Sequence, residues 1–168
     1  MQLTVISPPG EAALSLASAK AFLRVGHDGE DALIQGLIDS ATAALETATG
    51  LCLVQRTQRF SWTGWPTSLA RLGVLSLRPG PVKQLVAVRL VDGEDASTDI
   101  MGRFDLHDGR LCLQGAASLP PMPAGGRFEI EVFAGFGGAD EVPGDLQLAL
   151  QTIVQAAYAK PAGGEGLP

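Results

Sequence analysis

The two histidines, His27 and His107, are the side chains of this 168-residue chain that could exchange protons near neutral pH. A hydrolase that used either imidazole as its base would also need a nucleophile within hydrogen-bond reach. His27 lies in a short link between two predicted helices and His107 lies beside a predicted hairpin turn, but no nucleophile motif accompanies either one. We therefore interpret both as surface histidines and predict no catalytic residues, so the chain is classified as a non-enzyme.

The stretch from Gly135 to Gly138 is the closest approach to a phosphate-binding loop. A P-loop ends in Lys followed by Ser or Thr, whose side chains reach the phosphates and the metal ion. Neither residue type follows here, so the glycines predict a turn between a strand and a helix. An acidic turn at Asp92, Glu94 and Asp95 lacks the further oxygen ligands of a calcium loop and is predicted to be solvated.

The chain is acidic and rich in apolar residues. Its 12 Lys and Arg against 18 Asp and Glu give a net charge of −6, and 46% of its residues are hydrophobic, which excludes wholesale disorder. Binding to a DNA backbone depends on Lys and Arg, so the chain is poorly suited to binding DNA phosphates. Eight arginines are scattered through the middle of the chain, where a few could cluster in three dimensions: Arg56, Arg59, Arg71, Arg78, Arg89, Arg103, Arg110 and Arg127.

The two cysteines, Cys52 and Cys112, lie far apart, with no His or Cys at metal-ligand spacing. We predict free thiols, no metal site and no cofactor. No apolar run reaches the roughly 18 residues that a membrane span needs, and no secretory signal is visible at the N-terminus.

Two helices are predicted near the N-terminus, over residues 15–25 and 30–49. Ser15 can cap the first helix, and Gly26 and Gly50 are placed to end the two helices in the left-handed conformation. The second helix has a wide apolar stripe, which consists of Leu33, Ile34, Leu37, Ile38, Ala41, Ala44, Leu45 and Ala48.

Between residues 52 and 134 the hydrophobic period changes to two, which predicts a β-rich subregion. Strands are predicted at 53–62, 72–77, 85–91 and 128–133, with a hairpin at 104–113 around Asp108-Gly109. In the last strand Glu129 and Glu131 share one face, which we predict to be solvated.

A helix is predicted from Pro143 to about Lys160, with proline at its first position. From residue 146 to 159 it has no charged residue, which is typical of a helix that is buried all round. Either the two N-terminal helices or a neighbouring subunit could supply that burial. The candidate residues for contact with another copy or with a partner protein are Leu146, Gln147, Leu150, Gln151, Ile153, Val154, Gln155, Tyr158 and Lys160. Residues 161–168 are predicted to form a flexible tail.

These elements predict an α+β fold. Two N-terminal helices and a C-terminal helix form a small bundle, a β-rich middle subregion of about residues 52–134 is inserted between them in the sequence, and residues 1–168 form a single domain.

Two segments together resemble the phage head–tail connector, or adaptor, proteins of tailed phages, prophages and gene transfer agents. Residues 14–25, followed by 28–34 and 44–50, are similar to the opening of that family. Residues 132–149 are similar to its closing pattern, an aromatic Gly turn, then Val-Pro, then a helix. The residues that carry this motif are Gly135, Phe136, Gly137, Val142, Pro143, Leu146 and Ala149.

The resemblance implies a structural protein of the particle neck. Members of the family form a ring, typically a dodecamer, that binds the portal protein on one side and a tail-side neck or stopper protein on the other. DNA passes through the ring without sequence-specific binding, and neither a membrane nor a cofactor is involved. By the same resemblance, residues 159–168 would reach toward the portal. The alternative functions are a small DNA-binding packaging accessory protein and, less favoured, a hydrolase that uses His27 or His107.

Overall fold

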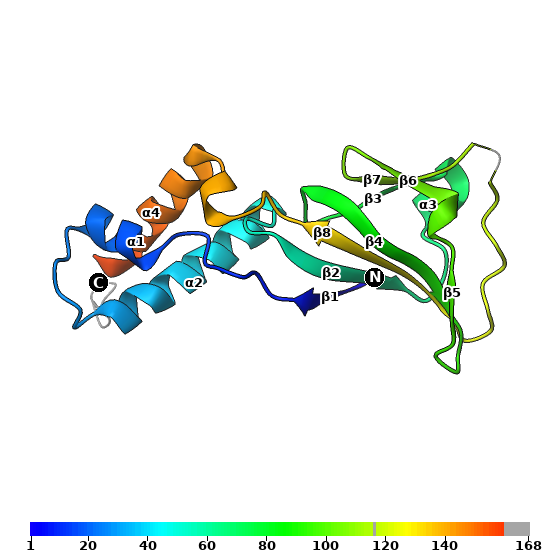
Figure 1. Ribbon diagram of the computed structural model, residues 1–168, viewed down its shortest axis with the longest axis horizontal. Helices are drawn as coiled ribbons and strands as arrows, with labels where there is room; N and C mark the ends of the chain where they lie inside the picture. Colours follow the sequence, from blue (N-terminus) through cyan, green and yellow to red (C-terminus); the bar gives the residue numbers. More distant parts are fainter. Residues whose placement is uncertain (116, 160–168) are drawn as a thin grey trace, which may run out of the picture. The chain divides into compact units, whose positions relative to one another are not determined.

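The computed structural model describes residues 1–115 and 117–159 (Figure 1). Its mixture of helices and antiparallel strands confirms the predicted α+β class. The chain divides into two units: Met1–Gly10 with Gln55–Gly135, and Glu11–Val54 with the chain from Phe136 onward. The first holds the strands of both sheets and the second holds the three longer helices, so we call them the β unit and the helical unit. The assignment of residues 1–168 to one connector domain stays a prediction.

Three helices form the helical unit: α1 (Leu16–Leu23), α2 (Asp31–Thr49) and α4 (Gly144–Tyr158). The hydroxyl of Ser15 caps α1 by accepting a hydrogen bond from the backbone nitrogen of Ser18 at 3.1 Å. The predicted end of this helix is wrong by two residues, because Arg24 rather than Gly26 adopts the left-handed conformation, with φ 61°. Gly50 ends α2 as predicted, with φ 66°.

The core of the helical unit uses only part of the predicted stripe on α2. Ile34, Ile38 and Ala41 are buried, whereas Leu33, Ala44 and Ala48 are exposed. The stripe is narrower than expected because, within this unit, α2 is covered on one side by α1 and α4. The residues that form the core are Ala13, Leu14, Ala19, Ile34, Ile38, Ala41, Leu53, Val54, Val142, Leu150 and Val154.

The larger sheet of the β unit is antiparallel throughout, in the order β1-β2-β8-β4-β5 within the described residues. Its strands are β1 (Gln2–Ser7), β2 (Arg56–Trp62), β8 (Arg127–Ala134), β4 (Val82–Val91) and β5 (Ser97–Asp99). β1 was not predicted from the sequence. In this sheet Phe60, Ile130 and Val88 are fully buried on one face.

A smaller sheet has the order β3-β7-β6, with β3 (Val74–Ser76), β7 (Arg110–Leu113) and β6 (Phe104–His107). The predicted hairpin is confirmed, since Asp108 and Gly109 both have positive φ, at 48° and 71°, between β6 and β7. A short helix that was not predicted, α3 (Thr67–Leu72), precedes β3. Two single turns of 3-10 helix, η1 (Met101–Arg103) and η2 (Ala139–Glu141), complete the elements.

Candidate interaction surfaces

One side of α4 belongs to the core of the helical unit. Leu150 and Val154 are fully buried, and Leu146, Ile153 and Tyr158 are half-buried against the same core. Within the chain, α1 and α2 cover only this side, so burial of the helix all round by a neighbouring subunit stays a prediction. The N-terminal helices therefore supply the burial of Leu150 and Val154. Pro143 stands one residue before the helix, at the N-cap, instead of at its first position.

The opposite side of α4 is exposed and carries no charge from Leu148 to Ala159. Leu148 is 56% exposed, and Thr152, Gln155 and Ala156 follow it on the same side, at steps of four and three residues. We call these four residues the neutral face. Exposed positions on helices are usually occupied by Lys, Glu and other charged residues, so this surface is suited to contact with protein. Of the other predicted glutamines, Gln151 is half-buried, and the amide of Gln147 donates to the backbone oxygen of Ala139 at 2.6 Å.

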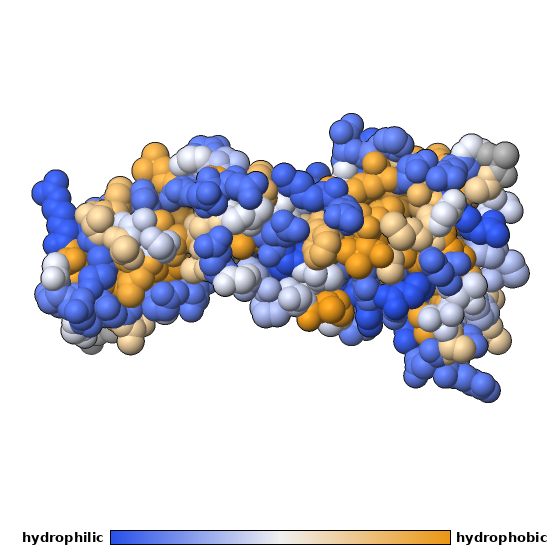
Figure 2. All heavy atoms as spheres, in the orientation of Figure 1, coloured by the Kyte–Doolittle hydropathy of each residue, from blue (hydrophilic) through white to orange (hydrophobic). Residues whose placement is uncertain are grey.

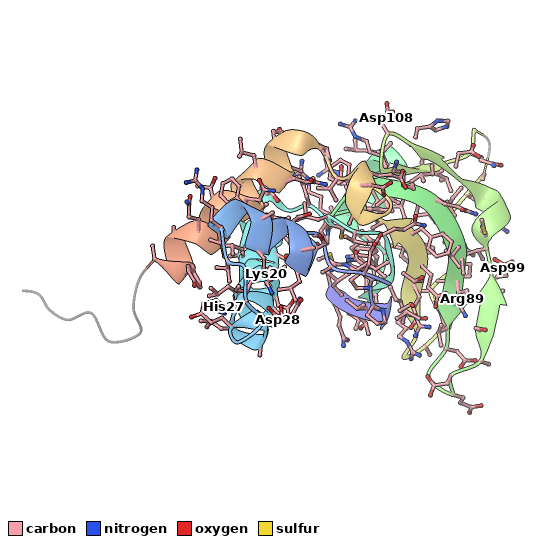
Figure 3. All side chains as sticks on the ribbon, turned by 60° about the vertical axis from the view of Figure 1, so that its left-hand side comes forward. Lys20, His27, Asp28, Arg89, Asp99 and Asp108 are labelled. Carbon is pink, nitrogen blue, oxygen red and sulfur yellow. The ribbon has the colours of Figure 1, made fainter. Side chains whose placement is uncertain are left out.

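The C-terminal end of α4 is held against the loop between α1 and α2. The Tyr158 hydroxyl donates to Glu30 Oε2 at 2.5 Å, and this bond raises the pKa of Tyr158. Lys20 Nζ, on α1, contacts Asp28 of this loop at 2.7 Å and Asp31, the first residue of α2, at 2.6 Å, which raises the pKa of Lys20 and lowers that of Asp28 (Figure 3). The bond between Tyr158 and Glu30 ties the last residue of α4 to this loop. Lys160 and the predicted tail lie outside the described residues.

The glycine turn that was predicted as part of a family motif leads from β8 toward α4. The backbone nitrogen of Phe136 donates to Leu53 at 3.1 Å, and its half-buried ring packs on the helical core. Gly137 has φ 139°, and a Cβ atom there would collide with the carboxylate of Glu141, so only glycine fits. The next two backbone nitrogens donate to carboxylates, Gly138 to Glu141 at 3.1 Å and Ala139 to Glu11 at 2.8 Å. The predicted turn is confirmed, and these amides, which a phosphate would need, already have acidic partners.

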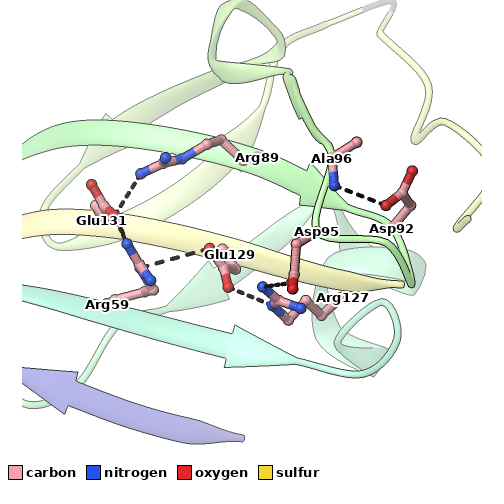
Figure 4. Close-up of polar contacts among 8 residues, drawn as sticks. All are labelled: Arg59, Arg89, Asp92, Asp95, Ala96, Arg127, Glu129 and Glu131. Carbon is pink, nitrogen blue, oxygen red and sulfur yellow. Dashed lines mark hydrogen bonds and ion pairs between the residues drawn. The ribbon is translucent and has the colours of Figure 1, made fainter. Parts of the chain in front are cut away.

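Glu129 and Glu131 are not solvated, which corrects the sequence prediction. Their side chains are only 7% and 11% exposed, because the sheet register places Arg59 opposite Glu131 and Arg89 opposite Glu129. Arg59 Nε donates to Glu131 at 2.9 Å, and Arg89 contacts the same carboxylate oxygen at 2.5 Å (Figure 4).

Arg127 extends this network along the strand. It contacts Glu129 at 2.7 Å and Asp95 at 2.8 Å, and the two carboxylates raise its pKa. Three of the eight scattered arginines do cluster, as the sequence analysis allowed, but three carboxylates balance their charges. The cluster therefore offers no net positive charge to a nucleic acid.

Neither histidine lies in a catalytic arrangement of the kind considered above. His27 is exposed, 3.8 Å from Glu30, and His107 is exposed at the end of β6. Cys52 is buried and Cys112 is half-buried, and the two do not form a disulfide with each other. In residues 1–115 and 117–159, no three His, Cys, Asp or Glu side chains are grouped so as to hold a metal ion. Over the same residues, no helix has the length and hydropathy of a membrane span.

The chain is similar to known proteins over nearly its whole length. The family of phage gp6-like head-tail connector proteins matches residues 13–69. A chain from the neck of an empty gene transfer agent particle, computed with C6 symmetry, is 30% identical with a TM-score of 0.85, and the match covers 99% of this chain and 88% of that one. A chain from the neck of a native particle, computed with C12 symmetry, is 29% identical with a TM-score of 0.83, over 100% and 88% of the two chains.

A third similar chain comes from the virion of a native gene transfer agent particle. It is 29% identical with a TM-score of 0.82, over 100% of this chain and 90% of that one. No curated protein matches the sequence.

Proposed function

This chain belongs to the family of phage gp6-like head-tail connector proteins, and we propose that it is a structural adaptor in the neck of a gene transfer agent or phage particle. The observation that carries the proposal is the match of nearly the entire chain, both units included, to chains that stand in such necks. A fold alone does not specify a function, but here the fold, the family and 30% identity agree.

Copies of the chain form a ring in this proposal. The similar chains stand in necks computed with C6 and C12 symmetry. A closed ring needs head-to-tail contacts, in which one surface of each copy meets a different surface of the next. The neutral face of α4 supplies one of these surfaces, because Leu148 and its uncharged neighbours can be desolvated at little electrostatic cost. Gln155 contributes hydrogen bonds within this face, and the half-buried Gln151 contributes them beside it.

The ring binds the portal protein on one side and a tail-side neck or stopper protein on the other. The portal contact is assigned to residues 159–168, most of which lie outside the described residues. The bond between Tyr158 and Glu30 supports this assignment, since it holds the end of α4 in one position. Because a net charge of −6 and the balanced arginine cluster give DNA little to bind, DNA passes through without specific contacts.

The adaptor carries out no catalysis and needs no cofactor in this proposal. The competing function, a DNA-binding packaging accessory protein, predicts a salt-sensitive mobility shift of duplex DNA. We expect no shift at low salt.

Imaging of intact particles tests the proposed function. We expect density for this chain at the junction below the capsid vertex, and deletion of its gene should give DNA-filled heads that lack tails. Complementation with the wild-type gene should restore tailed particles. Normal tail joining in the deletion strain would overturn the proposal.

A further inference from the structure

The two edges of the larger sheet differ in how they are protected. β5, at one edge, has three residues and includes Asp99, and short or charged edge strands resist pairing with another chain. β1, at the other edge, has six residues with neither charge nor proline, and among the described strands it pairs only with β2. Its outer row of backbone N–H and C=O groups is therefore open to another extended segment.

Two apolar side chains of β1 lie on the buried face of the larger sheet but are themselves exposed at its edge. Leu3 lies opposite Phe60 and Val5 opposite Gln58, and both of these β2 residues are fully buried. Leu3 and Val5 are nevertheless 38% and 48% exposed. Figure 2 shows hydrophobic atoms at the surface where Figure 1 places β1.

A hollow of about 440 Å³ lies at the N-terminal end of β1, and it is lined by Met1, Trp62, Trp65 and Pro66 among others. Both tryptophans are half-buried. Trp65 is held in place because its Nε1 donates to the backbone oxygen of Pro120 at 3.1 Å and its ring lies 4.6 Å from that of Phe128. A segment that paired with β1 and continued past Met1 would reach this hollow. Exposed aromatic side chains fixed in this way are typical of the anchoring points of protein interfaces.

We propose that β1 and the tryptophan hollow together form a docking site for an extended segment of a different neck protein. The segment adds a strand to the sheet through main-chain hydrogen bonds along Gln2–Ser7. It is uncharged, with apolar side chains against Leu3 and Val5, because a charge buried there would have no partner on β1. A bulky apolar or proline side chain occupies the hollow beside Trp62 and Trp65.

Among the residues that the structure describes, the chain offers no suitable strand of its own, so the proposed occupant is a different protein, an argument that rests on the proposed ring. Pairing of β1 with β1 of another copy needs a twofold axis, and neighbours in a cyclic ring are not related by one. Pairing with β5 of the next copy would cover three of the six residues and place Asp99 in the contact. The edges of the smaller sheet are β3, of three residues, and β6, which carries Asp105 and His107.

Site-specific photo-crosslinking in assembled particles tests the site. A p-benzoylphenylalanine residue replaces Val5 in one strain and Val86 in a control strain, since both are exposed strand valines, at 48% and 38%, but Val86 lies on β4, three strands from β1. A third strain carries it at Leu148. We expect the probe at Val5 to give an adduct with another particle protein, identified by mass spectrometry. Its yield should be about ten times that of the probe at Val86, because Val5 lies in the proposed interface and Val86 does not.

The outcome at Leu148 separates this inference from the proposed function. Suppose that Leu148 gives an adduct between two copies of the chain. If Val5 then gives no adduct, or only an adduct between copies, the docking site is overturned and the proposed function is not. Absence of the chain from the particles in all three strains would overturn the proposed function. As a second measurement, Val5→Lys should reduce the amount of the crosslinked partner in purified particles about tenfold, while Val86→Lys leaves it unchanged.

Discussion

Replacement of Leu148 by glutamate should abolish ring assembly and leave the fold of the chain intact. The side chain is 56% exposed, and glutamate is as good a helix former as leucine. A surface change of this kind alters the free energy of unfolding by no more than about 0.5 kcal/mol. For a chain of this length, the corresponding change in melting temperature is about 1–2 °C.

The loss at the proposed contact between copies is much larger. Full burial of a leucine side chain is worth about 1.5–3 kcal/mol, so the part that the single chain leaves exposed, 56%, is worth about 0.8–1.7 kcal/mol when the next copy covers it. Glutamate loses this term, and burial of its carboxylate without a partner adds several kcal/mol more. Because the penalty recurs at every contact around a closed ring, assembly should fail.

Circular dichroism melting and electron microscopy of particles measure the two effects separately. Leu72→Glu is the matched control, since Leu72 is 76% exposed at the end of α3 in the β unit. We expect both variants to melt like the wild type, and only Leu148→Glu to give heads without tails. Tailed particles at wild-type frequency with Leu148→Glu would refute the placement of the neutral face between copies.

Three further substitutions test the interior contacts. Leu150→Glu should also abolish assembly, but by unfolding the chain, because Leu150 is fully buried in the helical core; a folded Leu150→Glu chain by circular dichroism would contradict this. Glu131→Gln should lower the free energy of unfolding by about 1–3 kcal/mol in urea titrations, because it leaves Arg59 and Arg89 without their shared carboxylate, whereas the exposed control Glu94→Gln should change it little. The pKa of Tyr158 is raised by its bond to Glu30, so the stability from that bond is complete below about pH 10 and is lost as pH rises through the folded value. The difference in unfolding free energy between the wild type and Tyr158→Phe should therefore be constant up to about pH 9 and shrink above pH 10, and a constant difference at all pH values would exclude this contact.

The helices were predictable because their signals are local. Ser15 and Gly50 mark a cap and an end, and the apolar period of α2 is long enough to be unambiguous. What the period could not show is how much of the stripe the neighbouring helices cover, so Leu33 was expected to be buried and is exposed.

The missed elements are short. β1 has the alternation of Leu3 and Val5 with Gln2 and Thr4, followed by a pair of prolines, a signal that could have indicated an edge strand. In α3, six residues give less than two helical turns, which is too few for a period to appear. Only its last residue, Leu72, fell within the strand predicted at 72–77, which contains β3.

The environment of Glu129 and Glu131 depends on partners that are distant in sequence. Alternation correctly places both carboxylates on one face of β8, but it does not specify what lies beside them. Arg59 is 72 residues away from Glu131, and only the register of the sheet brings the two together. The same limit applies to the candidate site, because the absence of charge on α4 was visible in the sequence while the division into a buried and an exposed side was not.

In the proposed function, the distribution of charge explains how an acidic connector would bind protein neighbours. Its charges pair with one another where they gather, at Lys20 with two aspartates and at Glu131 with two arginines. Its uncharged exposed surfaces, the neutral face and β1, lie in different units with separate cores. Because contacts without shared partners act independently, the chain can change its affinity for one neighbour without loss of the other. Such separation is what a protein that joins unlike components requires.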